Sequence, residues 1–279
     1  MKIVKNISVE GKHNKPILTD LSYNENKQAK QIVIFCHGYK GYKDWGAWNL
    51  MAENFAKNNI FFVKMSFSHN GGTIEQPIDF PDLKAFGNNN FTIELDDIDS
   101  VLNWVLKNSS IQNEIDPMRI TLIGHSRGGG SVLIKASEDK RITSVITWAG
   151  ISDFGSKFTN EEQINAWKKN GVVFVENGRT KQQMPHYFQF YVNYKESESR
   201  LSIQNAVKNL KIPYLIIHGS EDETVLLKEA EDLLSWNSNN RLFVIKHANH
   251  SFGSKQPWDS SSLPQDLDTV VKKSINFIS

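Results

Sequence analysis

Short apolar runs alternate with amphipathic helical patterns along most of the 279-residue chain. The later runs are apolar throughout, which is typical of strands buried on both faces of a parallel sheet. The first two runs flank a short turn and predict an antiparallel start. The alternation predicts an α/β protein with an eight-stranded, mostly parallel sheet flanked by helices. The predicted strands are Ile3–Val9, Ile17–Tyr23, Gln31–Cys36, Ile60–Ser66, Arg119–Gly124, Ile142–Ala149, Tyr214–His218 and Arg241–Ile245.

Helical periodicity occupies the gaps between several of these runs. The expected helices are Thr92–Asn108, Ser131–Ser137, Thr224–Trp236 and Leu267–Phe277. Thr224 stands where a hydroxyl could cap the third of them. In the first, Glu94, Asp97 and Asp99 fall off the apolar stripe, so we expect them on the polar face.

The alternation stops between residues 151 and 209, where aromatic side chains become dense. A segment of this length is too long for a loop inside a compact domain. We therefore expect residues 1–150 and 210–279 to form one core and residues 151–209 to form a cap inserted after the sixth strand. Most of its aromatic rings should fill a small core of their own. Trp167, Tyr187 and Tyr191 are the candidates for contact with a substrate.

Composition and charge narrow the class of protein. Hydrophobic residues make up 39% of the chain and charged residues 23%, which is typical of a soluble globular domain. The net charge of +1 gives no field that would attract nucleic acid or an anionic membrane, and no apolar run approaches the roughly 20 residues of a membrane span. The start of the chain lacks a signal-peptide pattern, and the single Cys36 can form no internal disulfide, so we expect a cytoplasmic protein.

The strongest chemical signal is the run Gly124-His125-Ser126-Arg127-Gly128, which follows an apolar strand and precedes a helical pattern. A nucleophile on a sharp strand-to-helix turn needs small residues two positions before and after it, because these positions crowd each other. Gly124 and Gly128 meet that need. The alternative is a glycine-rich turn that merely contains a serine. The dinucleotide-binding and P-loop patterns are both absent here.

A serine nucleophile needs a base within hydrogen-bond reach. The loop after the last predicted strand offers two, His247 and His250. His247 lies close to the strand end, whereas His250 lies further out, ahead of Phe252. We take His250 as the base and keep His247 as the alternative.

The base needs a carboxylate to orient it, and three follow the preceding strand: Glu221, Asp222 and Glu223. A short, buried side chain suits this task, which favours Asp222. Glu221 or Glu223 is expected to complement the dipole of the following helix. The chain order Ser, Asp, His matches one known triad order and excludes the two protease orders that begin with His or Asp.

Acyl transfer also needs two backbone N–H groups that stabilise the developing oxyanion. One is expected from Arg127, directly after the nucleophile. The other is expected from Tyr39, in a loop where Gly38 and Gly41 give the backbone freedom to present it. His37 should order this loop by hydrogen bonds.

Three neighbouring side chains have simpler explanations than catalysis. Cys36 is expected to be a buried residue at a strand end. His69, in the loop after the fourth strand, is expected to be structural or to contact the rim of the site. The Arg127 side chain could pair with a carboxylate of the cap or contact an anionic substrate.

These motifs together resemble the α/β-hydrolase fold, and within it the dienelactone-hydrolase-like and feruloyl (cinnamoyl) esterase group. The resemblance covers His37-Gly38-Tyr39, Gly124-His125-Ser126-Arg127-Gly128-Gly129, His218-Gly219-x-x-Asp222-x-x-Val225 and Asn249-His250-Ser251-Phe252. It implies a serine hydrolase without metal or organic cofactor, with Ser126, Asp222 and His250 as the triad. The loop Ser66–Gly72 departs from the usual pattern of the group.

We therefore expect a serine carboxylesterase that cleaves small or aromatic esters through an acyl-enzyme, with a small-molecule ester as its partner and neither nucleic acid nor membrane. One alternative is a small serine peptidase or amidase with the same triad. The other is a non-catalytic ligand-binding protein that keeps the fold.

Overall fold

A computed structural model describes residues 1–279 and contains one sheet of eight strands in the order β1-β2-β4-β3-β5-β6-β9-β10. β2 is antiparallel to both β1 and β4, and every other neighbouring pair is parallel. The predicted fold class is confirmed. The strands are β1 (Lys2–Val9), β2 (Ile17–Tyr23), β3 (Lys30–Cys36), β4 (Phe61–Ser66), β5 (Ile115–His125), β6 (Ser144–Trp148), β9 (Tyr214–Gly219) and β10 (Arg241–Ile245).

Apolar side chains of the central strands alternate between two cores. In β3, Ile32 and Ile34 face one core, and Val33 and Phe35 face the other. The first core is closed by α3, α4, α7 and α8, and the second by α1 and α9. The helices are α1 (Trp48–Lys57), α2 (Leu83–Asn88), α3 (Phe91–Lys107), α4 (Arg127–Glu138), α5 (Glu161–Asn170), α6 (Gln189–Glu196), α7 (Ile203–Asn209), α8 (Leu227–Ser235) and α9 (Gln265–Ile278).

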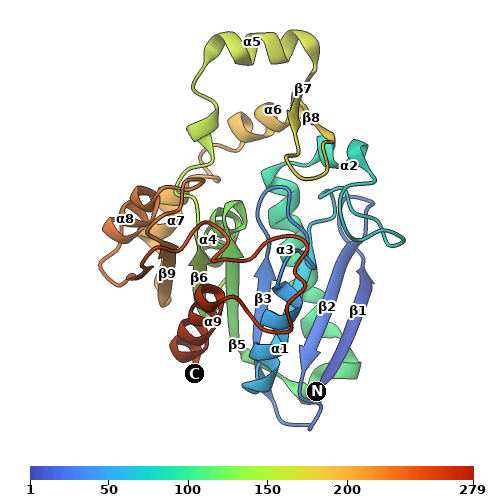
Figure 1. The fold of residues 1–279 in the computed structure, drawn as a ribbon, viewed down its shortest axis with the longest axis vertical. Helices are drawn as coiled ribbons and strands as arrows, with labels where there is room; N and C mark the ends of the chain where they lie inside the picture. Colours follow the sequence, from blue (N-terminus) through green and yellow to red (C-terminus); the bar gives the residue numbers. More distant parts are fainter.

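The chain between β6 and β9, residues 151–209, leaves the main sheet, and we call it the β6–β9 segment. It contains α5, α6 and a separate antiparallel pair, β7 (Val172–Glu176) and β8 (Gln183–Tyr187). Figure 1 shows these elements at the top of the molecule, with β8 beside α2. The last helix of the segment, α7, packs against α4 of the main core.

Two expectations about the helices are wrong. The helix predicted from Thr224 begins at Leu227 and has no side-chain cap. The Thr224 N–H instead donates to Asp222 at 2.8 Å, because these residues form a loop around that carboxylate. Glu94 and Asp97 of α3 are fully buried rather than on the polar face, since each finds hydrogen-bond donors inside the protein.

No helix in the structure combines the length and apolar character that crossing a membrane requires.

Candidate active site

Ser126 lies on the turn between β5 and α4, with φ 56° and ψ −124°. This conformation is strained for a residue with a side chain, and such strain is often stored at functional sites. The turn is also crowded: a Cβ added at Gly124 would lie 2.3 Å from the Gly128 carbonyl oxygen, and one at Gly128 would lie 2.4 Å from the His37 oxygen. Both glycines are therefore required by backbone packing, as the motif predicts.

The loops after β9 and β10 bring an aspartate and a histidine together. His250 Nδ1 lies 2.8 Å from Asp222 Oδ2. The other oxygen, Oδ1, accepts the N–H groups of Thr224 and Val225 at 2.8 and 2.9 Å. Burial opposes ionisation of Asp222, but hydrogen bonds from His218 and His250, together with the Val225 N–H, hold the pKa of this carboxyl well below its usual range. Asp222 is therefore a carboxylate at neutral pH.

The alternative base, His247, lies elsewhere. It is exposed, and its Nδ1 pairs with Glu221 at 2.5 Å rather than with Asp222. Because α8 begins only at Leu227, Glu221 and Glu223 lie outside its first turn, contrary to expectation.

A second histidine holds the His250 loop against the turn of Ser126. His125 Nε2 donates to the His250 carbonyl oxygen at 2.9 Å, and the two rings lie 4.8 Å apart. Burial lowers the pKa of His125 to about 3, so its ring is neutral. Ser126 Oγ makes no hydrogen bond to His250 in this structure. Catalytic hydrogen bonds of this kind often tighten only when substrate binds.

The loop after β3 lies directly against Ser126. A Cβ at Gly38 would be 2.7 Å from Ser126 Cβ, so only glycine lets the loop approach this closely. The next N–H, that of Tyr39, has no acceptor within the protein. His37 orders the loop as expected: its Nε2 accepts the Phe67 N–H at 3.2 Å, and its Nδ1 donates to the Gly38 oxygen at 2.8 Å.

Arg127 occupies the first position of α4, where backbone N–H groups have no acceptor within the helix. Its side chain pairs with Glu94 of α3 at 2.5 Å, not with a carboxylate of the β6–β9 segment as one reading predicted. Glu94 is fully buried and also accepts from Asn89 and Ser131. The Arg127 guanidinium lies 5.1 Å from the centre of the Tyr39 ring.

The loop after β3 is fixed by buried ion pairs at the end that leads into α1. Lys43 and Lys64 each lie 2.8 Å from an oxygen of Asp20, and Lys64 also pairs with Asp44 at 2.5 Å. Lys43 pairs with Asp44 as well. All four side chains are buried or nearly so, and they anchor the end of this loop to β2 and β4.

Replacing Lys64 with methionine is expected to lower the free energy of unfolding by about 3–5 kcal/mol, because the change leaves buried carboxylates without one of their two cations. Lys57→Met is the matched control, since Lys57 is exposed and lies 4.0 Å from Glu53. It should change stability by less than about 0.5 kcal/mol. Urea unfolding of both variants measures the difference, and equal stabilities would contradict the role given to the cluster.

Asp97 lies beneath the loop after β4. Its Oδ2 accepts the Ser68 N–H at 2.7 Å, while its buried Oδ1 has no partner. Burial raises the pKa of Asp97 to about 8, whereas the pKa of an aspartate in the unfolded chain is about 3.9. Between these two pH values the folded protein keeps this proton and the unfolded chain loses it. The free energy of unfolding contributed by this group therefore falls as the pH rises from about 4 to 8.

Asp97→Asn is expected to stabilise the protein, and the gain should be larger at pH 8 than at pH 5 by at least about 1 kcal/mol. The amide keeps an acceptor for the Ser68 N–H but cannot ionise. Asp99→Asn, on the same helix at a partly exposed position, is the control and should give no such gain. Urea unfolding at the two pH values measures both. A gain that does not grow with pH would contradict burial of an ionisable proton here.

The aromatic candidates of the β6–β9 segment lie in different surroundings. Trp167 is buried within the segment and donates its indole N–H to the His186 carbonyl oxygen at 2.8 Å. The Tyr187 ring packs against Gly87 of α2. Tyr191 lies beside Phe188 at the edge of a surface hollow of about 370 Å³ between α5 and α6.

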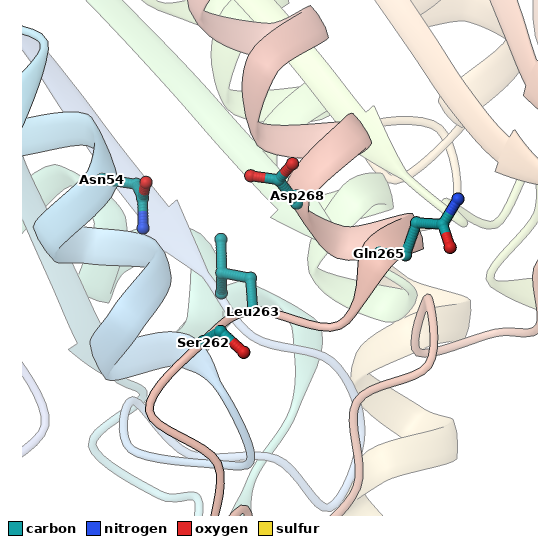
Figure 2. Close-up of a pocket in the computed structure, with 5 residues that line it drawn as sticks. All are labelled: Asn54, Ser262, Leu263, Gln265 and Asp268. Atoms are coloured by element: carbon teal, nitrogen blue, oxygen red, sulfur yellow. The ribbon is translucent and has the colours of Figure 1, made fainter.

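Another hollow lies away from these residues. Figure 2 shows the residues that line it, between α1 and the start of α9: Asn54, Ser262, Leu263, Gln265 and Asp268. Its volume is about 470 Å³. Its only hydroxyl belongs to Ser262, and no histidine lines it that could act as a base. The structure also has no group of three or more His, Cys, Asp or Glu side chains that could hold a metal ion.

The loops after β5, β9 and β10 of the mostly parallel sheet carry Ser126, Asp222 and His250, in this chain order. This is the arrangement of α/β hydrolases. The chain belongs to the BD-FAE family, whose model matches residues 19–236.

Solved structures share the fold along nearly the whole chain. Est1E from Butyrivibrio proteoclasticus with ferulic acid bound has a TM-score of 0.73 and 17% identity, and the match covers 97% of both chains. A dienelactone hydrolase from Anabaena variabilis has a TM-score of 0.62 and 18% identity, covering 99% of this chain and 96% of that one. The resemblance predicted from the motifs is confirmed.

A further sequence match is to a protein whose name gives no activity. An uncharacterised 31.7 kDa protein of Escherichia coli, from the traX-finO intergenic region, is 24% identical over 216 residues. The match covers 72% of this chain and 66% of that protein, so slightly less than two thirds of the relative is spanned.

Proposed function

We propose that this protein is a serine carboxylesterase with Ser126 as nucleophile, His250 as general base and Asp222 as the acid that orients it. One observation carries the proposal: a serine in a strained conformation lies against the Gly38 loop, while His250, paired with the buried Asp222, is tied to the neighbouring His125. Membership of the BD-FAE family supports the same reaction class.

The reaction would proceed in two steps. In the first, His250 Nε2 takes the proton of the Ser126 hydroxyl while Oγ attacks the ester carbonyl carbon. The tetrahedral oxyanion accepts hydrogen bonds from the N–H groups of Tyr39 and Arg127. The C–O bond to the alcohol then breaks, and the alcohol leaves with the proton from His250.

In the second step, His250 takes a proton from water, and the resulting hydroxide attacks the acyl-enzyme carbonyl. The bond to Ser126 Oγ breaks, the proton returns to the serine, and the carboxylic acid leaves. Asp222 keeps its negative charge throughout. Its hydrogen bond to Nδ1 fixes the tautomer that leaves Nε2 free, and its charge stabilises the imidazolium that forms in each step.

We further propose that the β6–β9 segment acts as a cap over this site and that the acyl group is aromatic or small. The aromatic rings of the segment and its position beyond α2 support a cap. The structure of Est1E with ferulic acid bound, which has the same fold, supports an aromatic acid. Aromatic side chains provide a large apolar surface for such a ring.

A panel of p-nitrophenyl esters of increasing acyl length, with methyl ferulate, tests this function. We expect hydrolysis of the short esters and of methyl ferulate, with activity falling as the acyl chain lengthens. The p-nitroanilide of the best acyl group is the matched comparison, and it should turn over far more slowly. Faster turnover of the anilide would indicate an amidase. Binding of ferulate without hydrolysis of any ester would indicate a non-catalytic protein.

A further inference from the structure

One hydrogen bond joins the proposed oxyanion loop to the β6–β9 segment. The Tyr39 hydroxyl lies 2.7 Å from Nε2 of His186, on β8, and the two rings lie 5.5 Å apart. Phe86 of α2 packs against both rings, with centroid distances of 6.0 and 5.5 Å. The contact therefore joins three parts of the chain that are far apart in sequence.

His186 is held firmly on its own side of this contact. Its backbone pairs with Val173 in the β7–β8 ladder, and its carbonyl oxygen accepts the Trp167 indole N–H at 2.8 Å. The next residue, Tyr187, packs so closely on Gly87 that a Cβ there would lie 2.8 Å from the ring. β8 is therefore seated on α2 with little room to shift.

Tyr39 is the residue whose backbone N–H is proposed to bind the oxyanion. It follows Gly38, which touches Ser126, and precedes Lys40, whose φ of 54° is left-handed. Its hydroxyl contacts His186, and the Arg127 guanidinium lies 5.1 Å from the centre of its ring. Arg127 provides the second proposed N–H. The two residues that provide the proposed oxyanion donors, Tyr39 and Arg127, are therefore also in contact through their side chains.

The hydrogen bond is one between neutral groups over a wide pH range. Burial raises the pKa of the Tyr39 phenol to about 12. Burial, together with the charges of Arg127 and Lys40, lowers the pKa of His186 to about 4. The phenol therefore keeps its proton, and the imidazole stays uncharged, at every pH where a histidine base could work.

We propose that His186 is a positioning residue for catalysis: through the Tyr39 hydroxyl it fixes the peptide that presents the Tyr39 N–H to the oxyanion. The inference rests on the proposed esterase function. It assigns the β6–β9 segment a part in the chemical step, since docking of β8 completes the oxyanion hole. Loss of this contact should weaken transition-state stabilisation and leave ground-state binding of the ester nearly unchanged.

The test uses His186→Phe and Tyr39→Phe, which remove the hydrogen bond from opposite sides and keep both rings. Each variant should lower kcat for a p-nitrophenyl ester about tenfold, less than the 10²–10³-fold of losing a donor outright. KM should stay within about twofold, and a trifluoromethyl ketone, which forms a tetrahedral adduct on the serine, should bind about tenfold more weakly. The double variant should be no worse than either single one, because both remove the same bond.

Two further variants separate positioning from general support of the fold. His186→Gln retains a group that can hydrogen-bond to the phenol, and it should recover most of the lost kcat. Arg179→Gln breaks a different contact between the β6–β9 segment and the core, the ion pair with Asp79, and should leave kcat unchanged. Urea unfolding of all variants identifies any that fold poorly.

The outcomes are distinguishable. Tenfold losses confined to kcat and to ketone affinity, without further loss in the double variant, would support the inference. An unchanged kcat in His186→Phe, additive losses in the double variant, or an equal loss in Arg179→Gln would overturn it while leaving the esterase function intact. A wild-type protein that hydrolyses no ester would overturn the proposed function and this inference with it.

Discussion

Ser126→Ala is expected to lower kcat for ester hydrolysis by about a million-fold, to the residual rate that oxyanion stabilisation and substrate binding supply without a nucleophile. The loss should be this large because the hydroxyl forms the covalent intermediate, and neither His250 nor Asp222 can act without it. The affinity for the ester should persist, since the substitution leaves the N–H groups of Tyr39 and Arg127 in place. Steady-state kinetics on the best p-nitrophenyl ester measure the effect.

Ser137→Ala is the matched control, because Ser137 is exposed near the end of α4, the helix that Ser126 precedes. It should keep full activity. If the folded Ser126→Ala variant still hydrolysed esters at the wild-type rate, the covalent mechanism on Ser126 would be excluded.

His250→Asn is expected to cost about as much, on the order of a million-fold in kcat, because the serine then has no base. His247→Asn is a control of the same chemistry three residues away, and it should change kcat by less than about twofold. The contrast follows from the structure, where His250 lies 2.8 Å from the buried Asp222 and His247 pairs with the exposed Glu221.

The same assay measures both variants. A large loss in His247→Asn with little effect of His250→Asn would reverse the assignment of the base and would require the loop after β10 to rearrange when substrate binds.

Much of the fold could be predicted because its strands are short, apolar runs with clear ends. β2 and β10 have the bounds that the hydrophobic pattern predicts, and the other six strands of the main sheet differ only at their ends. Gly124 could be predicted for a local reason, because a Cβ there would meet the backbone of Gly128, on the same turn. Gly128 is restricted by the distant His37 backbone as well.

Other features depend on contacts between distant residues, which periodicity does not report. Glu94 appears polar in a helical pattern, yet it is buried because Arg127 and Ser131 lie against it in the fold. Lys64 lies in an apolar strand and shares two aspartates with Lys43. The β7–β8 pair is short and half exposed, so it lacks the continuous apolar run that marks the main strands.

The contact between Tyr39 and His186 is of the same kind. The two residues are 147 positions apart, and neither lies in a motif that predicts the other. The sequence offers a tyrosine in a glycine-rich loop and a histidine between a proline and a tyrosine, and only the packing of β8 on α2 brings them together.

Reaction with a fluorophosphonate, followed by intact-mass and peptide mass spectrometry, tests the central claim most directly. An activated serine attacks the phosphorus and displaces fluoride, so the account predicts one stable adduct per chain, located on Ser126. Ser126→Ala should show no adduct, and His250→Asn should react far more slowly than His247→Asn. Absence of an adduct on the folded wild-type protein, or an adduct on another residue, would contradict a serine hydrolase built on Ser126.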